Sequence, residues 1–269
     1  MSSPPTPPPK PTPQRRRTLA ALLLIGVAAA APILMSPGGR SAGAAIDRCG
    51  LPPDFAALSQ PLPHTAARLL AGGPLTIVAL GSSSTEGAGA TKPERSYPSR
   101  LAVALRARFP GMDIRVVNRG VSGELAPQMV ARMERDVLAE KPDLVIWQLG
   151  TNSVLHDLDP DTEIDVARRG IATLKAAGID VVLMDLQYAP AVLAHGGYHD
   201  MLRVLAGVAR SEDVPLFHRF SVMRHWAEEG QMNVRMMLAR DRLHMSDASY
   251  ECLAQQIAHS IVAAAASRS

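Results

Sequence analysis

Residues 75–80 form a short, almost wholly apolar run that is rich in β-branched side chains and ends at Gly81. This pattern is typical of a parallel strand that is buried on both faces of a sheet. Three serines, Ser82 to Ser84, follow directly. Open α/β folds bind ligands beyond the carboxyl ends of their strands, so the pattern predicts hydroxyl groups at a binding edge. A serine-rich turn that only begins the next helix is the alternative.

The remainder of the chain repeats this alternation of apolar strands and helices. Further strands are expected over residues 113–117, 143–149, 180–186 and 214–217. Helical spacing predicts helices over residues 65–71, 97–109, 125–138, 163–177 and 248–265, one that ends near 210, and helical pieces within 222–239. Alternating strands and helices need crossover connections, hence a mostly parallel sheet covered on both faces. The sequence therefore predicts one α/β domain over residues 46–269.

Residues 1–45 differ from this domain in composition. Residues 1–13 are a Ser/Pro/Thr tract that we expect to be disordered. Three consecutive arginines then precede an apolar run over residues 19–35, and small residues follow. This order predicts a secretory signal peptide with cleavage after Ala44. An uncleaved membrane anchor formed by residues 19–35 is the alternative. Both predict an exported protein, periplasmic or secreted.

The formal charge of +3 arises from this leader. Residues 1–45 contain five of the 28 basic residues and no acidic residue, so the remainder has 23 basic and 25 acidic residues. This balance predicts no cationic surface for a polyanion, and we expect no nucleic-acid partner. Membrane contact is expected only through the N-terminal segment, if that segment is not cleaved.

Two cysteines, Cys49 and Cys252, are far apart in the sequence. In an oxidising compartment they could pair and join the N-terminal part of the domain to its last helix. Two free thiols are equally compatible with the sequence.

Four polar clusters follow predicted strands or lie in the last long loop. They are Ser82–Ser84, Ser122-Gly123, Thr151-Asn152, and Asp241 with His244. A serine hydroxyl becomes nucleophilic when a neighbouring imidazole takes its proton, and a carboxylate commonly holds that imidazole in one tautomer. The charge that develops on an attacked carbonyl needs preorganised donors, which amides supply. Together the clusters contain every group that acyl transfer requires.

The clusters resemble the motif blocks of the SGNH (GDSL-type) hydrolase family over most of the domain. The family's Gly-Asp-Ser block aligns with Gly81-Ser82-Ser83, which implies that Ser83 is the nucleophile rather than Ser82 or Ser84. The Asp-x-x-His block aligns with Asp241 and His244, which implies that His244 is the base and Asp241 its orienting carboxylate.

The resemblance also implies an oxyanion hole. The Asn-x-x-x-Ser-Gly block aligns with Asn118 and Ser122-Gly123, and the Gly-x-Asn block with residues 150–152. The implied donors are the backbone amides of Ser83 and Gly123 and the side chain of Asn152. Two positions depart from the family pattern: Ser82 stands where the family has Asp, and Ser153 where it often has Asp.

The family further implies a three-layer α/β/α, flavodoxin-like sheet of about five strands, ester hydrolysis through an acyl-enzyme, and neither metal nor cofactor. We therefore expect an exported serine esterase acting on a small-molecule, lipid or glycan ester. An O-acyltransferase on the same scaffold and a non-catalytic binding module are the alternatives. His195 and His199 have a spacing that can bind metal in a helix, but Gly196 and Gly197 lie between them and favour a loop.

Overall fold

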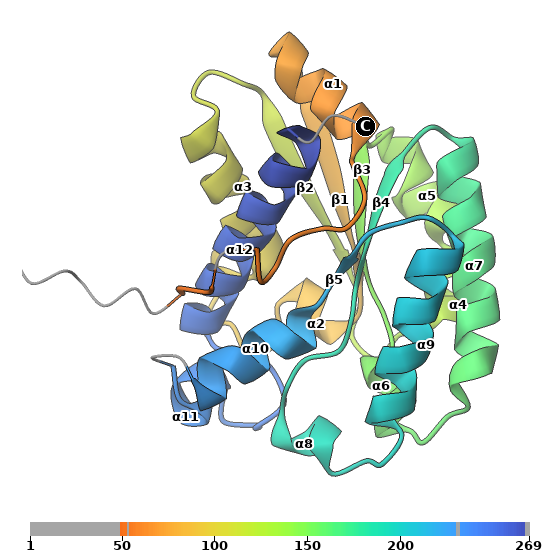
Figure 1. Cartoon of the computed structure of the whole chain (residues 1–269), viewed down its shortest axis with the longest axis vertical. Helices are drawn as coiled ribbons and strands as arrows, with labels where there is room; N and C mark the ends of the chain where they lie inside the picture. Colours follow the sequence, from red (N-terminus) through yellow and green to blue (C-terminus); the bar gives the residue numbers. More distant parts are fainter. Residues whose placement is uncertain (1–48, 53, 230–231, 267–269) are drawn as a thin grey trace, which may run out of the picture. The chain divides into compact units, whose positions relative to one another are not determined.

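The sheet of this protein has five parallel strands in the order β2-β1-β3-β4-β5 (Figure 1). The strands are β1 (Leu75–Gly81), β2 (Ile114–Gly120), β3 (Leu144–Gln148), β4 (Asp180–Met184) and β5 (Leu216–Phe217). A computed structural model describes residues 49–52, 54–229 and 232–266. The expected signal peptide or anchor in residues 1–45 lies outside these residues. Within them, no helix is both long and apolar enough to cross a membrane.

Helices cover both faces of the sheet, which gives three layers (Figure 1). One face carries α1 (Pro63–Ala71), α3 (Tyr97–Arg108) and α12 (Asp247–Ala266). The other carries α4 (Ala126–Ala131), α5 (Met133–Asp136), α7 (Pro160–Ala176) and α9 (Tyr198–Ser211). The predicted three-layer α/β/α fold is therefore confirmed.

Five further helices lie on the side of the strands' carboxyl ends, in the lower half of the view in Figure 1. They are α2 (Ser83–Glu86), α6 (Thr151–Leu155), α8 (Pro190–Leu193), α10 (Arg219–Glu228) and α11 (Val234–Met237). Two 3-10 turns, η1 (Pro93–Arg95) and η2 (Leu138–Glu140), complete the elements of the described chain. Gly81 and Gly120 are register partners, so the segments after β1 and β2 leave the sheet at the same level.

The burial of the three inner strands, β1, β3 and β4, explains why the sequence predicts them as apolar runs. Every residue of β3 and β4 is buried, and so is every residue of β1 except Thr76. Each buried apolar side chain contributes about 1.5–3 kcal/mol relative to exposure, so these runs fix the centre of the fold. The edge strand β2 is largely half-buried and contains polar residues, which matches its weaker signal in the sequence.

Two of the predicted helices differ clearly from those in the structure. The helix expected over residues 125–138 is divided into α4, α5 and η2, with the first break at Arg132. The helix expected from residue 163 begins at Pro160, because the Asp159 side chain accepts the backbone N–H of Asp161 and caps the first turn.

Cys49 and Cys252 form a disulfide. The side-chain amide of Gln256 also donates to the backbone oxygen of Cys49, over 2.6 Å. Both contacts join the first described residues to α12.

Candidate active site

Ser83 is the first residue of α2, directly beyond the carboxyl end of β1. Its Oγ lies 2.7 Å from Nε2 of His244, although the two residues are 161 positions apart. The hydroxyls of Ser82 and Ser84 bind other residues than His244. The structure therefore brings the predicted serine, and neither of its neighbours, into contact with the imidazole.

Ser82 and Ser84 are buried and bind Gln148, the last residue of β3. Gln148 Oε1 accepts the backbone N–H of Ser82 over 2.9 Å and its hydroxyl over 3.0 Å. The Ser84 hydroxyl donates to the same oxygen over 3.2 Å. Ser82, which departs from the family's Asp, is thus a small buried hydroxyl that shares a neutral acceptor.

His244 is held by Asp241, three residues earlier in the α11–α12 loop. Nδ1 of His244 lies 2.6 Å from Oδ2 of Asp241. A carboxylate only accepts hydrogen bonds, so Nδ1 carries the proton and Nε2 is left to accept the Ser83 hydroxyl. The side chain of His244 is 15% exposed and that of Asp241 is 47% exposed. The three side chains form a continuous Ser–His–Asp hydrogen-bond relay.

The loop itself orients the Asp241 carboxylate. Oδ1 accepts the backbone N–H groups of Leu243 over 3.0 Å and His244 over 2.9 Å. Partial burial raises the pKa of Asp241, but the hydrogen bonds from the His244 ring and these two amides outweigh it, and the pKa is lowered overall. Gln187 anchors the loop by donating to the backbone oxygen of Leu243 over 3.0 Å.

The two further residues assigned to the oxyanion hole come from neighbouring loops. Asn152, at 9% exposure, lies in α6, and its Nδ2 donates to the backbone oxygen of Glu124 over 2.8 Å. Gly123, exposed and with φ +81°, directly precedes Glu124. The Asn152 amide therefore lies against the loop that carries Gly123.

Two buried polar residues beneath the site were not predicted. Gln148 could have been noticed, because it is a polar residue that ends an otherwise apolar strand. Arg219 is fully buried at the start of α10, where Nη1 donates to Ser84 Oγ over 2.8 Å and Nη2 to Thr151 Oγ1 over 3.4 Å. Burial lowers the pKa of Arg219 to about 10, with Asp185 acting in the opposite direction, so the side chain is a cation at neutral pH. Nothing in the sequence marks this arginine as buried.

The other histidines weighed in the sequence have different surroundings. His195 Nδ1 lies 2.9 Å from Asp157 Oδ1, a pair between two loops of the described chain. Among the described residues, no group of three or more His, Cys, Asp or Glu side chains could hold a metal ion.

A parallel three-layer sheet with a serine, a histidine and an aspartate meeting beyond its carboxyl edge defines an SGNH-type hydrolase. Within this class, residues 48–267 match the non-GDSL lipase-like family, and the chain belongs to that family.

Three curated esterases resemble parts of the chain. It is 41% identical over 63 residues to an acetylxylan esterase of Geobacillus stearothermophilus and 32% identical over 97 residues to an arylesterase of Vibrio mimicus. These segments cover 23% and 36% of this chain but only 29% and 48% of the two relatives. Esterase TesA of Pseudomonas aeruginosa is 28% identical over 149 residues, which cover 55% of this chain and 69% of that protein.

Solved structures show the same fold. A structure of TesA has a TM-score of 0.60 and 25% identity, and the match covers 70% of this chain and 99% of that chain. A two-domain esterase active on acetylated mannans, crystallised with mannopentaose, has a TM-score of 0.61 and 24% identity. That match covers 75% of this chain and 52% of the other.

Proposed function

We propose that this protein is an exported serine esterase that hydrolyses carboxylic esters through an acyl-enzyme on Ser83. The observation that carries the proposal is the relay from Ser83 Oγ to His244 Nε2 at 2.7 Å and from His244 Nδ1 to Asp241 Oδ2 at 2.6 Å. These lengths lie within the range of hydrogen bonds that transfer a proton during catalysis.

In the first step, His244 Nε2 takes the proton of the Ser83 hydroxyl while Oγ attacks the ester carbonyl carbon. Asp241 keeps the imidazole oriented and stabilises the imidazolium that forms. The tetrahedral intermediate then collapses, the bond to the alcohol oxygen breaks, and His244 returns the proton to that oxygen. In the second step His244 deprotonates a water molecule, which attacks the carbonyl carbon of the acyl-enzyme. The bond from that carbon to Ser83 Oγ then breaks, His244 returns the proton to Oγ, and the acid leaves.

The negative charge of each tetrahedral intermediate is assigned to three donors: the backbone amides of Ser83 and Gly123 and the side-chain amide of Asn152. One N–H of the Asn152 amide already binds Glu124, which leaves the other for the substrate. Removing one such donor typically lowers kcat by about 10²–10³-fold.

The proposed substrate is an ester of an extracytoplasmic glycan or lipid, with an acetylated glycan preferred. This preference is supported by the relatives, which include an acetylxylan esterase and an esterase active on acetylated mannans. Export is supported by the basic and apolar leader and by the Cys49–Cys252 disulfide, since disulfides persist in oxidising compartments. Residues 46–269 are proposed to be the single hydrolase domain.

The test is the intact mass of the purified protein after incubation with a fluorophosphonate. We expect one adduct on the wild type and on Ser82→Ala and none on Ser83→Ala, because of the three neighbouring serines it is Ser83 whose hydroxyl binds His244. Ser83→Ala, which forms no adduct, should also fail to hydrolyse acetyl esters. A folded wild type that forms no adduct would contradict the proposal. An adduct on a protein that consumes the acetyl ester only when a sugar acceptor is present, with the acetyl group recovered on the sugar, would favour acyl transfer instead.

A further inference from the structure

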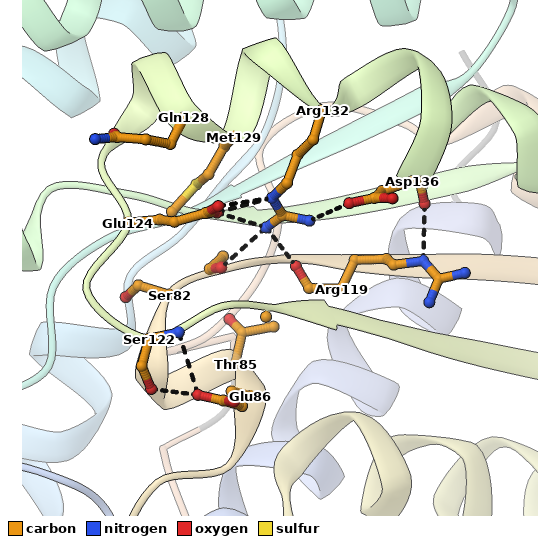
Figure 2. Close-up of polar contacts among 12 residues, drawn as sticks. Ser82, Thr85, Glu86, Arg119, Ser122, Glu124, Gln128, Met129, Arg132 and Asp136 are labelled. Carbon is orange, nitrogen blue, oxygen red and sulfur yellow. Dashed lines mark hydrogen bonds and ion pairs between the residues drawn. The ribbon is translucent and has the colours of Figure 1, made fainter.

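In the sequence, Gly123 lies between Ser122 and Glu124, and charged side chains hold both of these residues in place. Figure 2 shows the contacts of Glu86 with Ser122 and of Arg132 with Glu124. On the first side, the backbone N–H of Ser122 donates to Oε2 of Glu86 over 3.1 Å, and the Ser122 hydroxyl donates to the same oxygen. Glu86 is the last residue of α2, the helix that begins at Ser83. The residue before Gly123 is therefore bound to the helix that carries the proposed nucleophile.

The backbone of Glu86 also contacts the end of β2, directly before the loop that carries Ser122, Gly123 and Glu124. The side-chain amide of Asn118 donates to the Glu86 backbone oxygen over 3.1 Å, and Asn118 Oδ1 accepts the N–H of Gly120 over 2.9 Å. A Cβ on Gly120 would lie 2.0 Å from the Glu86 nitrogen, so only glycine permits this approach. These contacts fix the end of β2 and the loop that follows it against α2 at three points: Asn118, Gly120 and Ser122.

On the other side, Arg132 holds the side chain of Glu124. Nε lies 2.8 Å and Nη2 lies 2.7 Å from Glu124 Oε2, in a charge-assisted contact of the fork-like guanidinium (Figure 2). The Arg132 side chain is 8% exposed and that of Glu124 15%. Because both groups are largely removed from water, this pair is screened much less than a surface pair.

The guanidinium of Arg132 is itself fixed relative to the sheet. Nη2 donates to the backbone oxygen of Arg119 in β2 over 2.7 Å and to that of Gly81 in β1 over 3.5 Å, while Nη1 binds Asp136 Oδ2 over 3.1 Å. Gly81 is separated from Ser83 by a single residue. Arg132 therefore links Glu124 to the end of β1, the strand that leads to Ser83.

Glu124 joins both assigned oxyanion donors. Its nitrogen is one residue from Gly123, and its backbone oxygen accepts one N–H of the Asn152 amide over 2.8 Å. Because that amide is planar, binding one N–H fixes the direction of the other. A shift of Glu124 would move the Gly123 loop and turn the Asn152 amide together.

From these contacts, and on the basis of the proposed function, we propose that Arg132 and Glu86 are positioning residues for the oxyanion hole. Arg132 acts through Glu124 on Gly123 and Asn152, and Glu86 acts through Ser122 on Gly123. Neither residue is assigned a contact with substrate. A displacement of about 1 Å in a catalytic group can lower the rate by about 10²-fold, so the loss of either should appear in kcat.

The experiment compares Arg132→Met, Arg132→Lys, Glu86→Ala and Glu86→Gln with the wild type, using p-nitrophenyl acetate. Active sites are titrated with the fluorophosphonate, so that kcat refers to competent molecules only. We expect kcat to fall about 10- to 100-fold in Arg132→Met and Glu86→Ala, with KM within about twofold. Lysine keeps the charge but not the fork, and glutamine keeps the acceptor oxygen, so these variants should recover part of the loss.

A double-mutant cycle separates positioning from a general structural role. Once Asn152 is replaced by Ala, the Arg132→Met change should lower kcat less than it does in the wild type, because part of its path is gone. Glu86→Ala should keep its full effect in that background, since it acts through Ser122. Arg203→Met is the control: its side chain is 71% exposed and pairs with Asp200, outside this network, and kcat should not change.

The outcomes are distinguishable. A wild type without adduct or turnover would overturn the proposed function and this inference with it. An active wild type whose Arg132 and Glu86 variants keep kcat per titrated site would overturn the inference alone. Should Arg132→Met fail to fold, Arg132→Lys and the two variants of the exposed Glu86 provide the same comparison.

Discussion

Nη1 of Arg219 lies 2.8 Å from Oγ of Ser84, the residue that follows Ser83. The second terminal nitrogen of the same guanidinium lies 3.4 Å from the hydroxyl of Thr151, the residue before Asn152. A single buried cation thus joins the neighbours of two proposed catalytic residues. Its charge also faces Asp185, which is 2% exposed.

Replacing Arg219 with Met should lower the free energy of unfolding by about 3 kcal/mol, because Ser84 and Thr151 lose a buried charged donor and Asp185 loses a nearby cation. Asp185 keeps His218 and the Phe220 N–H as partners. Urea denaturation at pH 7 measures the loss. Adding Asp185→Asn to Arg219→Met should recover part of it, since the nearby buried carboxylate is then removed together with the cation. The control, Arg203→Met, removes an exposed ion pair with Asp200 and should change stability by less than about 0.5 kcal/mol. Equal stability of Arg219→Met and the wild type would contradict this account.

The lowered pKa of Asp241 predicts a pH-dependent contribution to stability. Its pKa in the folded protein lies below the unfolded value, so the stabilisation is complete above the unfolded value, about 3.9, and is lost as pH falls through the folded value. Asp241→Asn should therefore be less stable than the wild type at pH 6–8, and the difference should shrink below about pH 4. Denaturation at several pH values measures this, with the exposed Asp165→Asn as control. A difference that stays constant down to pH 3 would refute the linkage.

The elements that were predictable are those whose own sequence carries the signal. The runs at β1, β3 and β4 are apolar because both faces are buried. The serine, aspartate and histidine of the motifs occur along the chain in the order that the family pattern predicts. Strand β2 was expected to end at Val117, yet it continues to Gly120. Residues 118–120 pair with β1, and this pairing outweighs the poor strand propensity of Asn and Gly.

What could not be predicted depends on contacts between distant segments. The helix expected over residues 125–138 is broken at Arg132, whose guanidinium binds Glu124 and the ends of two strands. Arg219 is buried because hydroxyls from the β1 and β3 edges converge on it. Neither arginine differs in local sequence from one on a solvated helix face, so periodicity and composition contain no sign of these roles.

The disulfide predicts a large effect of reduction on stability. Cys49 and Cys252 are separated by 203 positions, and a bond that closes so long a loop removes much of the unfolded chain's conformational freedom. The double variant Cys49→Ser/Cys252→Ser should lose about 2–5 kcal/mol. A reductant should lower the Tm of the wild type to that of the variant, and it should leave the Tm of the variant unchanged. An unchanged wild-type Tm, with both thiols shown to be free by mass, would argue against a stabilising role.

The pKa of Glu163 is shifted in the opposite direction to that of Asp241, so its effect on stability has the opposite pH dependence. Its side chain lies in α7 at 6% exposure; Oε1 accepts the N–H of Gly150 over 3.4 Å, and Oε2 has no hydrogen-bond partner among the described residues. Burial raises the pKa of Glu163, and the backbone N–H groups of Gly150 and Ala126 only partly oppose this. The folded protein therefore favours the neutral carboxyl, and the stability that this group contributes is complete only below its unfolded pKa, about 4.3.

As pH rises through the raised pKa of Glu163, the wild type should lose stability that Glu163→Gln keeps, because the amide never ionises. We expect the two proteins to be similarly stable at pH 4 and the variant to be more stable at pH 8, as measured by urea denaturation. Glu94→Gln, a change at an exposed carboxylate, should show no such divergence. If the variant is instead less stable at pH 8, the ionised carboxylate must be stabilised by the backbone groups near it, those of Gly150 and Ala126. Gly150 directly precedes α6, so Glu163 would then contribute charge to the segment that carries Asn152.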